Sequence, residues 1–257
     1  MDEKLQMNLV KQGFKYGKSG AHAARSMMIK ELRLLFEATD ITASYQDYEQ
    51  AIINQNVLQK TTENSRKITL RHLRDLYGLS PDIRIFNVFR KWWDVSEDSQ
   101  PVLALQLAIA RDPLLRGSVD IVLQHSPGEI LSRRDIETYL IGDDPDRFST
   151  ASLTSFARNI NGTWTQAGYL TGKSKKIRTQ AKISFVNTAF ALFLAQCQDL
   201  SGQRMFNSQW CKLLNQEQEE LYRLAYAASL RGLLTFKHAS DVIEVTFPQS
   251  TLTDASH

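Results

Sequence analysis

Residues 131–182 read LSRRDIETYL IGDDPDRFST ASLTSFARNI NGTWTQAGYL TGKSKKIRTQ AK. Ser132 and Asp135 form a capping pair, which predicts a helix with an apolar side made by Ile136, Tyr139 and Leu140. The run 142–146 ends that helix, because Pro145 restricts the residue before it and the acidic residues favour turns. A second helix is predicted to start near Ser149, so the stretch has the pattern of a helix-turn-helix.

The second helix has two chemically different sides. One side is apolar at intervals of three or four residues, which predicts a buried face: Leu153, Phe156, Ala157, Ile160, Trp164 and Ala167. The opposite side carries short hydroxyls, an amide and one guanidinium, which suit contacts with phosphates and base edges. Its predicted DNA-binding residues are Ser152, Ser155, Arg158 and Asn159.

A basic hairpin is predicted to follow this helix. Tyr169 and Leu170 favour a short strand, and residues 171–178 would form the tip and the return. The cations after Gly172 are Lys173, Lys175, Lys176, Arg178 and Lys182, and no acidic residue lies between Ser149 and Lys182. The helices and hairpin together predict a winged helix whose wing contacts nucleic acid. The alternative is a solvated basic loop beside an ordinary helical hairpin.

The remaining pattern predicts a mainly α protein with small β-hairpins. We expect a helical N-terminal domain at 1–127, the winged helix-turn-helix at 128–182 and a C-terminal helical unit ending in a hairpin at 183–257. The C-terminal unit repeats the order helix, helix, hairpin, but its surface is not basic. The helices predicted outside the central stretch cover 23–38, 45–53, 62–77, a segment beginning at Ser80 and Pro81, 101–110, 119–124, 183–198, 206–214 and 217–230.

A second basic surface is predicted on the helix at 62–77. Arg66, Arg71 and Arg74 lie largely on its outward side and would lengthen a nucleic-acid footprint, although charge runs on helices are commonly plain solvated faces. Trp92 and Trp93 would be able to stack on bases, but their helical spacing favours the core.

Composition narrows the class of protein. The chain has 257 residues, 42% of them hydrophobic, and a net charge of +3, which favours a folded protein and makes the distribution of charge more informative than its total. No apolar run approaches twenty residues and no leader pattern is present, so we expect a cytoplasmic protein without membrane contact. Cys197 and Cys211 are expected to be free thiols.

The sequence offers little catalytic chemistry. Gly17, Lys18 and Ser19 match the end of a phosphate-binding loop, but Gln12 stands where the first glycine is required. The five histidines are scattered, and Asp143, Asp144 and Asp146 fit a turn better than a magnesium site. The sequence therefore predicts no enzyme activity, no metal site and no cofactor.

Parts of the first 170 residues resemble BrxA-type proteins of bacteriophage-exclusion (BREX) defence systems. The resemblance rests on four segments: Lys15, Tyr16 and Lys18; residues 25–36 with Glu31; Asn56, Val57 and Leu58 followed by Ser65 and Arg66; and Trp164, Ala167, Gly168, Tyr169 and Leu170. It implies an all-helical, non-catalytic defence protein that binds double-stranded DNA. This chain departs from the pattern at 92–116 and from Ile183 onward, which leaves the subfamily and its partners open.

The leading hypothesis is an accessory protein of a phage-defence system that binds double-stranded DNA. The second helix would border the major groove and the wing would neutralise phosphates. An assembly adaptor for a larger defence enzyme is the alternative of a different class. A transcription regulator is a third, but no heptad pattern provides the dimer that it would require.

Overall fold

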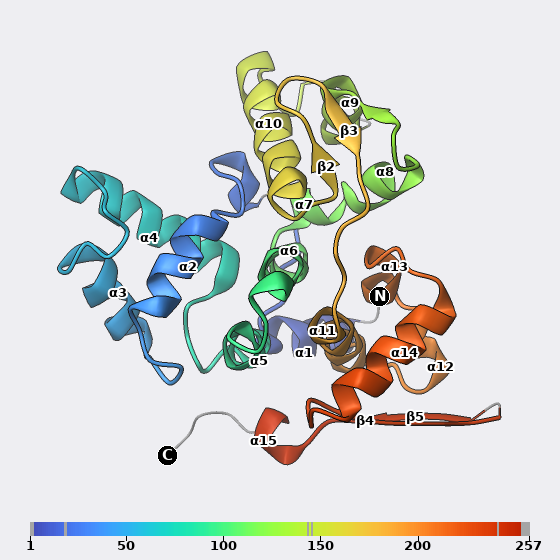
Figure 1. The fold of residues 1–257 in the computed structure, drawn as a ribbon. Coiled ribbons are helices and arrows are strands. Elements are labelled where there is room, and N and C mark those ends of the chain that lie inside the picture. Colours follow the sequence, from blue (N-terminus) through green and yellow to red (C-terminus); the bar gives the residue numbers. More distant parts are fainter. Residues whose placement is uncertain (1–2, 18–19, 143, 145, 241, 253–257) are drawn as a thin grey trace.

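The computed structural model describes residues 3–17, 20–142, 144, 146–240 and 242–252. It is mainly helical, with two small antiparallel sheets, as the sequence predicts (Figure 1). Lys18, Ser19, Asp143 and Pro145, which entered the predictions of a phosphate loop and an acidic turn, lie outside the described residues. Within the described part of the chain, no helix is both long enough and apolar enough to span a membrane.

Two helices that are buried nearly all round form the centre. These are α6 (Gln100–Arg111) and α11 (Phe185–Cys197), which contact each other and also α5 (Arg84–Trp93). Aromatic rings fill the space around them, and Trp92 and Trp93 belong to this core, as their spacing favours. Cys197 on α11 and Cys211, in the C-terminal part of the chain, are buried, and both are free thiols.

The N-terminal helices come first along the chain and contribute to the same core. They are α1 (Glu3–Gln12), the short 3-10 helix η1 (Ala21–Ala23), α2 (Ile29–Glu37), α3 (Tyr45–Ile53) and α4 (Glu63–Tyr77). The helix predicted at 23–38 begins only at Ile29, because Met28 adopts a left-handed conformation with φ of 54°. The helix predicted from Ser80 begins at Arg84, after a turn in which the Ser80 hydroxyl bonds Asp82.

The central stretch has the order helix, strand, two helices, two strands. After α7 (Pro113–Arg116) come α8 (Val119–Gln124), β1 (Ile130–Leu131), α9 (Arg133–Ile141), α10 (Thr150–Gln166), β2 (Leu170–Thr171) and β3 (Lys176–Arg178). The strands form a sheet in the order β1-β3-β2, with Ile130 opposite Ile177 and Leu170 opposite Arg178. The sequence gives no signal for the two-residue β1, which exists only through its pairing with β3.

The C-terminal helices pack on α11. They are α12 (Gln203–Phe206), α13 (Gln209–Leu213) and α14 (Gln218–Ser229), followed by the hairpin β4 (Thr235–Ala239) and β5 (Val242–Thr246) and by α15 (Gln249–Leu252). The single helix predicted at 206–214 is two short helices, since the Ser208 hydroxyl caps a new start at Gln209.

Long-range contacts cross the predicted boundaries near 127 and 182. The Trp164 ring nitrogen donates to the Ser118 hydroxyl at 2.8 Å, and the Tyr169 hydroxyl donates to the Leu213 carbonyl at 2.8 Å. One continuous apolar core runs from Leu9 to Phe247. The division into three domains stays a prediction.

Candidate nucleic-acid interface

Local hydrogen bonds position the two helices of the predicted DNA-binding stretch. Ser132 and Asp135 make a reciprocal capping box at the start of α9, and the Ser149 hydroxyl accepts the Ser152 amide at the start of α10. Capping groups satisfy amides that have no partner within the first turn, so they fix where each helix begins. Both starts agree with the sequence prediction.

The turn between β2 and β3 is the most accessible basic element of this stretch. Lys173 and Lys175 are exposed, while Lys176 is half-buried and its ammonium donates to the Gly172 carbonyl at 2.7 Å. Gly172 has φ of 89°, and a β-carbon there would lie 2.1 Å from the Lys175 carbonyl oxygen, so only glycine fits this tight turn. Two lysines are thereby held in solvent at the tip, available to phosphates.

Helix α10 is most exposed in its first half. Ser152 and Ser155 are half-buried on its first turns, and Arg158 is exposed. Asn159 differs from the prediction, because its side-chain amide donates to the His22 carbonyl at 3.0 Å and is directed toward the chain itself. In Figure 1 this first half projects beyond η1 at the top of the molecule.

The second half of α10 is fastened to residues 22–29. Thr163 accepts the Met27 amide at 2.9 Å, and Gln166 bonds both the Ile29 amide and the Ser26 hydroxyl. This half cannot enter a groove of DNA, so any contact with base edges has to come from residues 150–158.

Arg178 corrects the sequence prediction. Its side chain is only 1% exposed; the guanidinium donates to the Val122 and Tyr169 carbonyls at 3.2 and 3.3 Å, and also to the Thr179 carbonyl. It lies 5.0 Å from the centre of the Tyr169 ring. A guanidinium held this way joins α8 to the sheet and is not accessible to a phosphate. Lys182 is exposed and pairs with Asp98, away from the wing.

The arginines of α4 are divided between structural and exposed positions. Arg66 is half-buried and donates to the Ile53 carbonyl at 2.7 Å, so its predicted DNA contact is replaced by a bond to the end of α3. Arg71 and Arg74 are exposed and line a groove of about 510 Å³ between α3 and α4. Arg74 also lies 3.6 Å from the Asp75 carboxylate.

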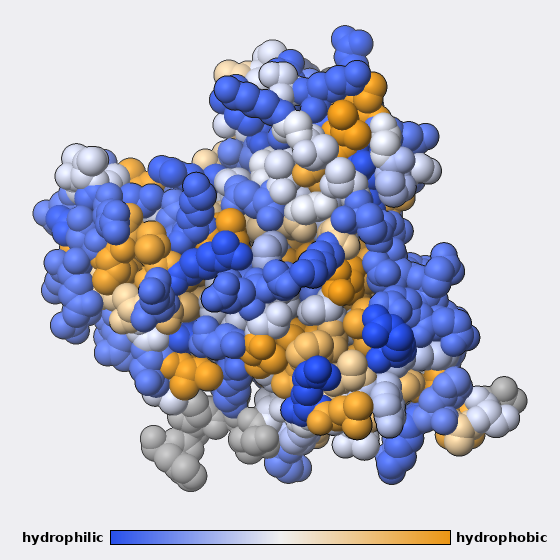
Figure 2. Space-filling model, viewed as in Figure 1, coloured by the Kyte–Doolittle hydropathy of each residue, from blue (hydrophilic) through white to orange (hydrophobic). Residues whose placement is uncertain are grey.

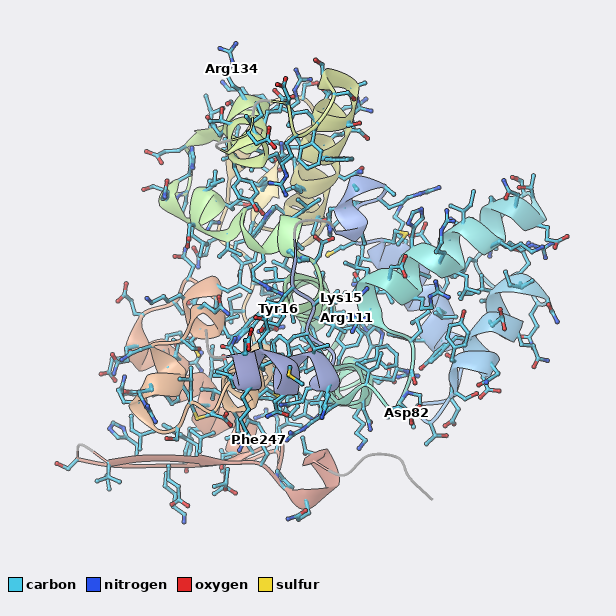
Figure 3. The ribbon with its side chains drawn as sticks, turned by 180° about the vertical axis from the view of Figure 1, so that it is seen from behind. Lys15, Tyr16, Asp82, Arg111, Arg134 and Phe247 are labelled. Carbon is cyan, nitrogen blue, oxygen red and sulfur yellow. The ribbon has the colours of Figure 1, made fainter. Side chains whose placement is uncertain are left out.

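Two accessible cations escaped the sequence prediction. Arg134 is exposed on α9 and projects from the same end of the molecule as the start of α10 (Figure 3). Arg25 is exposed after η1, which contacts both α4 and α10. Burial and the charges of Arg25 and Arg71 lower the pKa of His72 on α4, so Arg25 lies close to this helix. Figure 2 shows mostly hydrophilic residues over this end, with an apolar patch near β3.

A buried polar cluster fixes α10 to the rest of the protein. His22 Nδ1 lies 2.8 Å from Asp112 Oδ2, and His22 Nε2 lies 2.6 Å from the Thr163 hydroxyl. Asp112 also accepts the amides of His22, Leu114 and Leu115. Because a carboxylate only accepts, the proton is assigned to Nδ1, and the Thr163 hydroxyl donates to Nε2.

This cluster has the order hydroxyl, imidazole, carboxylate that activates a nucleophile in hydrolases. All three residues are completely buried, however, and the Thr163 oxygen is occupied by the Met27 amide. We assign the cluster a structural role because no substrate reaches the hydroxyl. Sequence reasoning missed it, since its members are 90 and 141 residues apart and no local pattern links them.

No protein-family model and no curated protein matches this chain. Among the described residues, no group of three histidine, cysteine, aspartate or glutamate side chains is placed to hold a metal ion. The accessible chemistry of this end of the molecule combines the hydroxyls and cations of the first half of α10, the basic turn, Arg134 and Arg25 with the exposed carboxylates of Asp144 and Asp146.

Proposed function

We propose that the protein binds double-stranded DNA without catalysis and that residues 119–178 form a winged helix. The observation that carries the proposal is the order α8, β1, α9, α10, β2, β3 with the sheet order β1-β3-β2, because it places an exposed basic turn beside the projecting start of α10. Helix-turn-helix proteins place the N-terminal residues of the second helix in the major groove. Here that position belongs to Ser152, Ser155 and Arg158.

The exposed cations are distributed so that different pairs would contact different phosphates of duplex DNA. Lys173 and Lys175 would bind phosphates beside the groove entered by α10, and Arg134 and Arg25 would bind phosphates on either side of it. Arg71 and Arg74 would extend the footprint along α4. The major groove of double-stranded RNA is too narrow for a helix, which favours DNA over RNA.

The biological setting of the proposal is phage defence in the cytoplasm. It rests on the resemblance to BrxA-type proteins in residues 15–66 and 164–170 and implies an accessory role beside other defence proteins. The proposed DNA contacts need no cofactor and no metal ion.

The test is fluorescence anisotropy of a random duplex over a salt series, comparing wild type with the Lys173→Ala, Lys175→Ala double variant. Each phosphate contact contributes about −0.9 to the slope of the logarithm of the binding constant against the logarithm of the salt concentration. Loss of two contacts should therefore make the slope of the variant less negative by about 1.8. At about 0.1 M salt its affinity should be roughly tenfold lower or weaker still.

The matched control for that test removes two exposed cations from the C-terminal helices. Arg204→Ala with Lys212→Ala changes the net charge equally, and we expect the wild-type slope. A wild type that binds with no salt dependence, or a control that loses as much affinity as the wing variant, contradicts the proposed site.

A second candidate function is protein assembly, and the outer face of α14 favours it. Tyr226 and Leu230 are 57% and 69% exposed, four residues apart on one side of the helix end. Neighbouring apolar side chains in solvent are typical of contacts with another protein. If a larger defence enzyme binds there, pull-down from the native host after nuclease treatment should recover it with wild type and lose it with Tyr226→Ser, Leu230→Ser.

A further inference from the structure

A cavity of about 650 Å³ lies on the opposite side of the molecule from the view of Figure 1. It is bounded by α1, the segment that follows α1, the end of α4 and the end of α6. Its apolar wall includes Val10 and Phe14, and its cations are Lys15 and Arg111. In Figure 3 these two cations lie together, next to Tyr16.

Backbone carbonyls hold the two cations in place, and each cation still has hydrogen-bond donors that are not used by any described residue. The Lys15 ammonium donates to the Asp75 carbonyl at 2.6 Å; Arg111 donates through Nε to the Leu76 carbonyl at 3.2 Å and through Nη1 to the Gly13 carbonyl at 2.5 Å. Two of these carbonyls belong to the last turn of α4, where cations are favourable. A lysine has three donors and an arginine five. The other donors of this pair, Arg111 Nη2 among them, have no partner among the described residues.

Among the described residues that line the cavity, Asp75 is the one acid, and its charge favours the cationic forms of Lys15 and Arg111. Arg74 shares this carboxylate at 3.6 Å, and Asp112 is committed to His22 and to the start of α7, so the cations outnumber the uncommitted acid. Burial and the charge of Arg111 lower the pKa of Lys15, and burial lowers the pKa of Arg111 to about 10. Arg111 therefore stays cationic at neutral pH, and an incoming anion relieves the repulsion that the two side chains exert on each other.

We propose that this cavity binds the phosphate group of a nucleotide-sized ligand, with Lys15 and Arg111 on the phosphate and Val10 and Phe14 against its organic part. The volume lies within the ordinary range for small-molecule sites. Charge-assisted bonds from lysine and arginine are the strongest that proteins offer to phosphate. The same chemistry would recognise a free nucleotide or the terminal phosphate of a nucleic-acid strand, and it does not depend on the proposed duplex binding.

The experiment is calorimetric titration of the full chain with ADP, with pyrophosphate, and with a trinucleotide carrying either a 5′-phosphate or a 5′-hydroxyl. We expect binding that falls at least about tenfold in Lys15→Gln, because a hydrogen bond to a charged group is lost. Lys11→Gln is the matched control, since Lys11 is exposed at the end of α1, four residues before Lys15, and does not line the cavity. Binding of ADP alone identifies a free nucleotide, and a requirement for the 5′-phosphate identifies a strand end.

A second variant separates a lost site from a lost fold. Val10 is 51% exposed, so Val10→Trp fills the cavity at little cost to the core. It should abolish binding while the circular dichroism spectrum and the unfolding midpoint stay those of wild type. The proposal is overturned if no phosphorylated ligand binds wild type, or if both Lys15→Gln and Val10→Trp bind as tightly as wild type.

Discussion

Asp112→Ala is expected to lower the free energy of unfolding by about 3–5 kcal/mol, because each buried donor left without an acceptor costs about 1–3 kcal/mol. The carboxylate is completely buried, bonds His22 through its ring and its amide, and caps the start of α7. Its removal leaves four buried N–H groups without an acceptor. Urea unfolding followed by circular dichroism measures the loss. Glu37→Ala, an exposed acid at the end of α2, is the control and should change stability by less than about 0.5 kcal/mol.

The same carboxylate gives the protein an acid-dependent stability. Burial raises the pKa of Asp112, but the hydrogen bonds from His22 and Leu115 outweigh it, and the net shift is below the ordinary value of 3.8. A lowered pKa in the folded state stabilises the fold above the unfolded value, and this contribution is lost as pH falls through the folded value. Wild type should therefore lose stability below about pH 4 more steeply than Asp112→Asn. If the stabilities of wild type and Asp112→Asn fall equally steeply with pH below about 4, Asp112 is not the source of the acid dependence.

Arg178→Ala is expected to destabilise the fold by about 2–4 kcal/mol, since it leaves buried carbonyls without donors and opens a space beside Tyr169. Lys175→Ala changes an exposed cation three residues away in the same hairpin and should change stability by less than about 0.5 kcal/mol. Thermal unfolding of both variants measures the difference. The effects of the two variants on DNA binding should be the opposite, when binding is measured at a temperature where both are folded. Lys175→Ala is expected to weaken binding, and Arg178→Ala is not. Equal stability of the two variants contradicts the buried role of Arg178.

Much of the fold follows from the sequence because its signals are local. The capping pair at Ser132 and Asp135 and the hydroxyl of Ser149 act within one turn of their helices, so the starts of α9 and α10 are correctly predicted. The apolar character of residues 101–110 predicts a central helix, and α6 is one. The segment at 23–28 fails as a helix because distant groups bind its backbone: Thr163 accepts the Met27 amide, and the Tyr77 hydroxyl donates to the Met27 carbonyl.

The candidate site was predictable in its composition but not in its accessibility. The absence of acids between Ser149 and Lys182 marks the basic turn, yet Lys175 and Arg178 look alike in sequence, and only the packing of α8 and Tyr169 on the sheet buries the arginine. Asn159 and Arg66 are likewise taken out of the predicted site by carbonyls of His22 and Ile53. Arg134 becomes part of it because α9 turns that side chain outward beside α10.

By itself, the sequence determined the helical class, the starts of the central helices and the basic turn, because capping, periodicity and charge runs act between residues a few positions apart. Only the tertiary structure decided which cations meet solvent, which half of α10 is covered, and that His22, Asp112 and Thr163 come together. Those outcomes depend on groups more than fifty residues apart, whose proximity is set by the packing of the whole core.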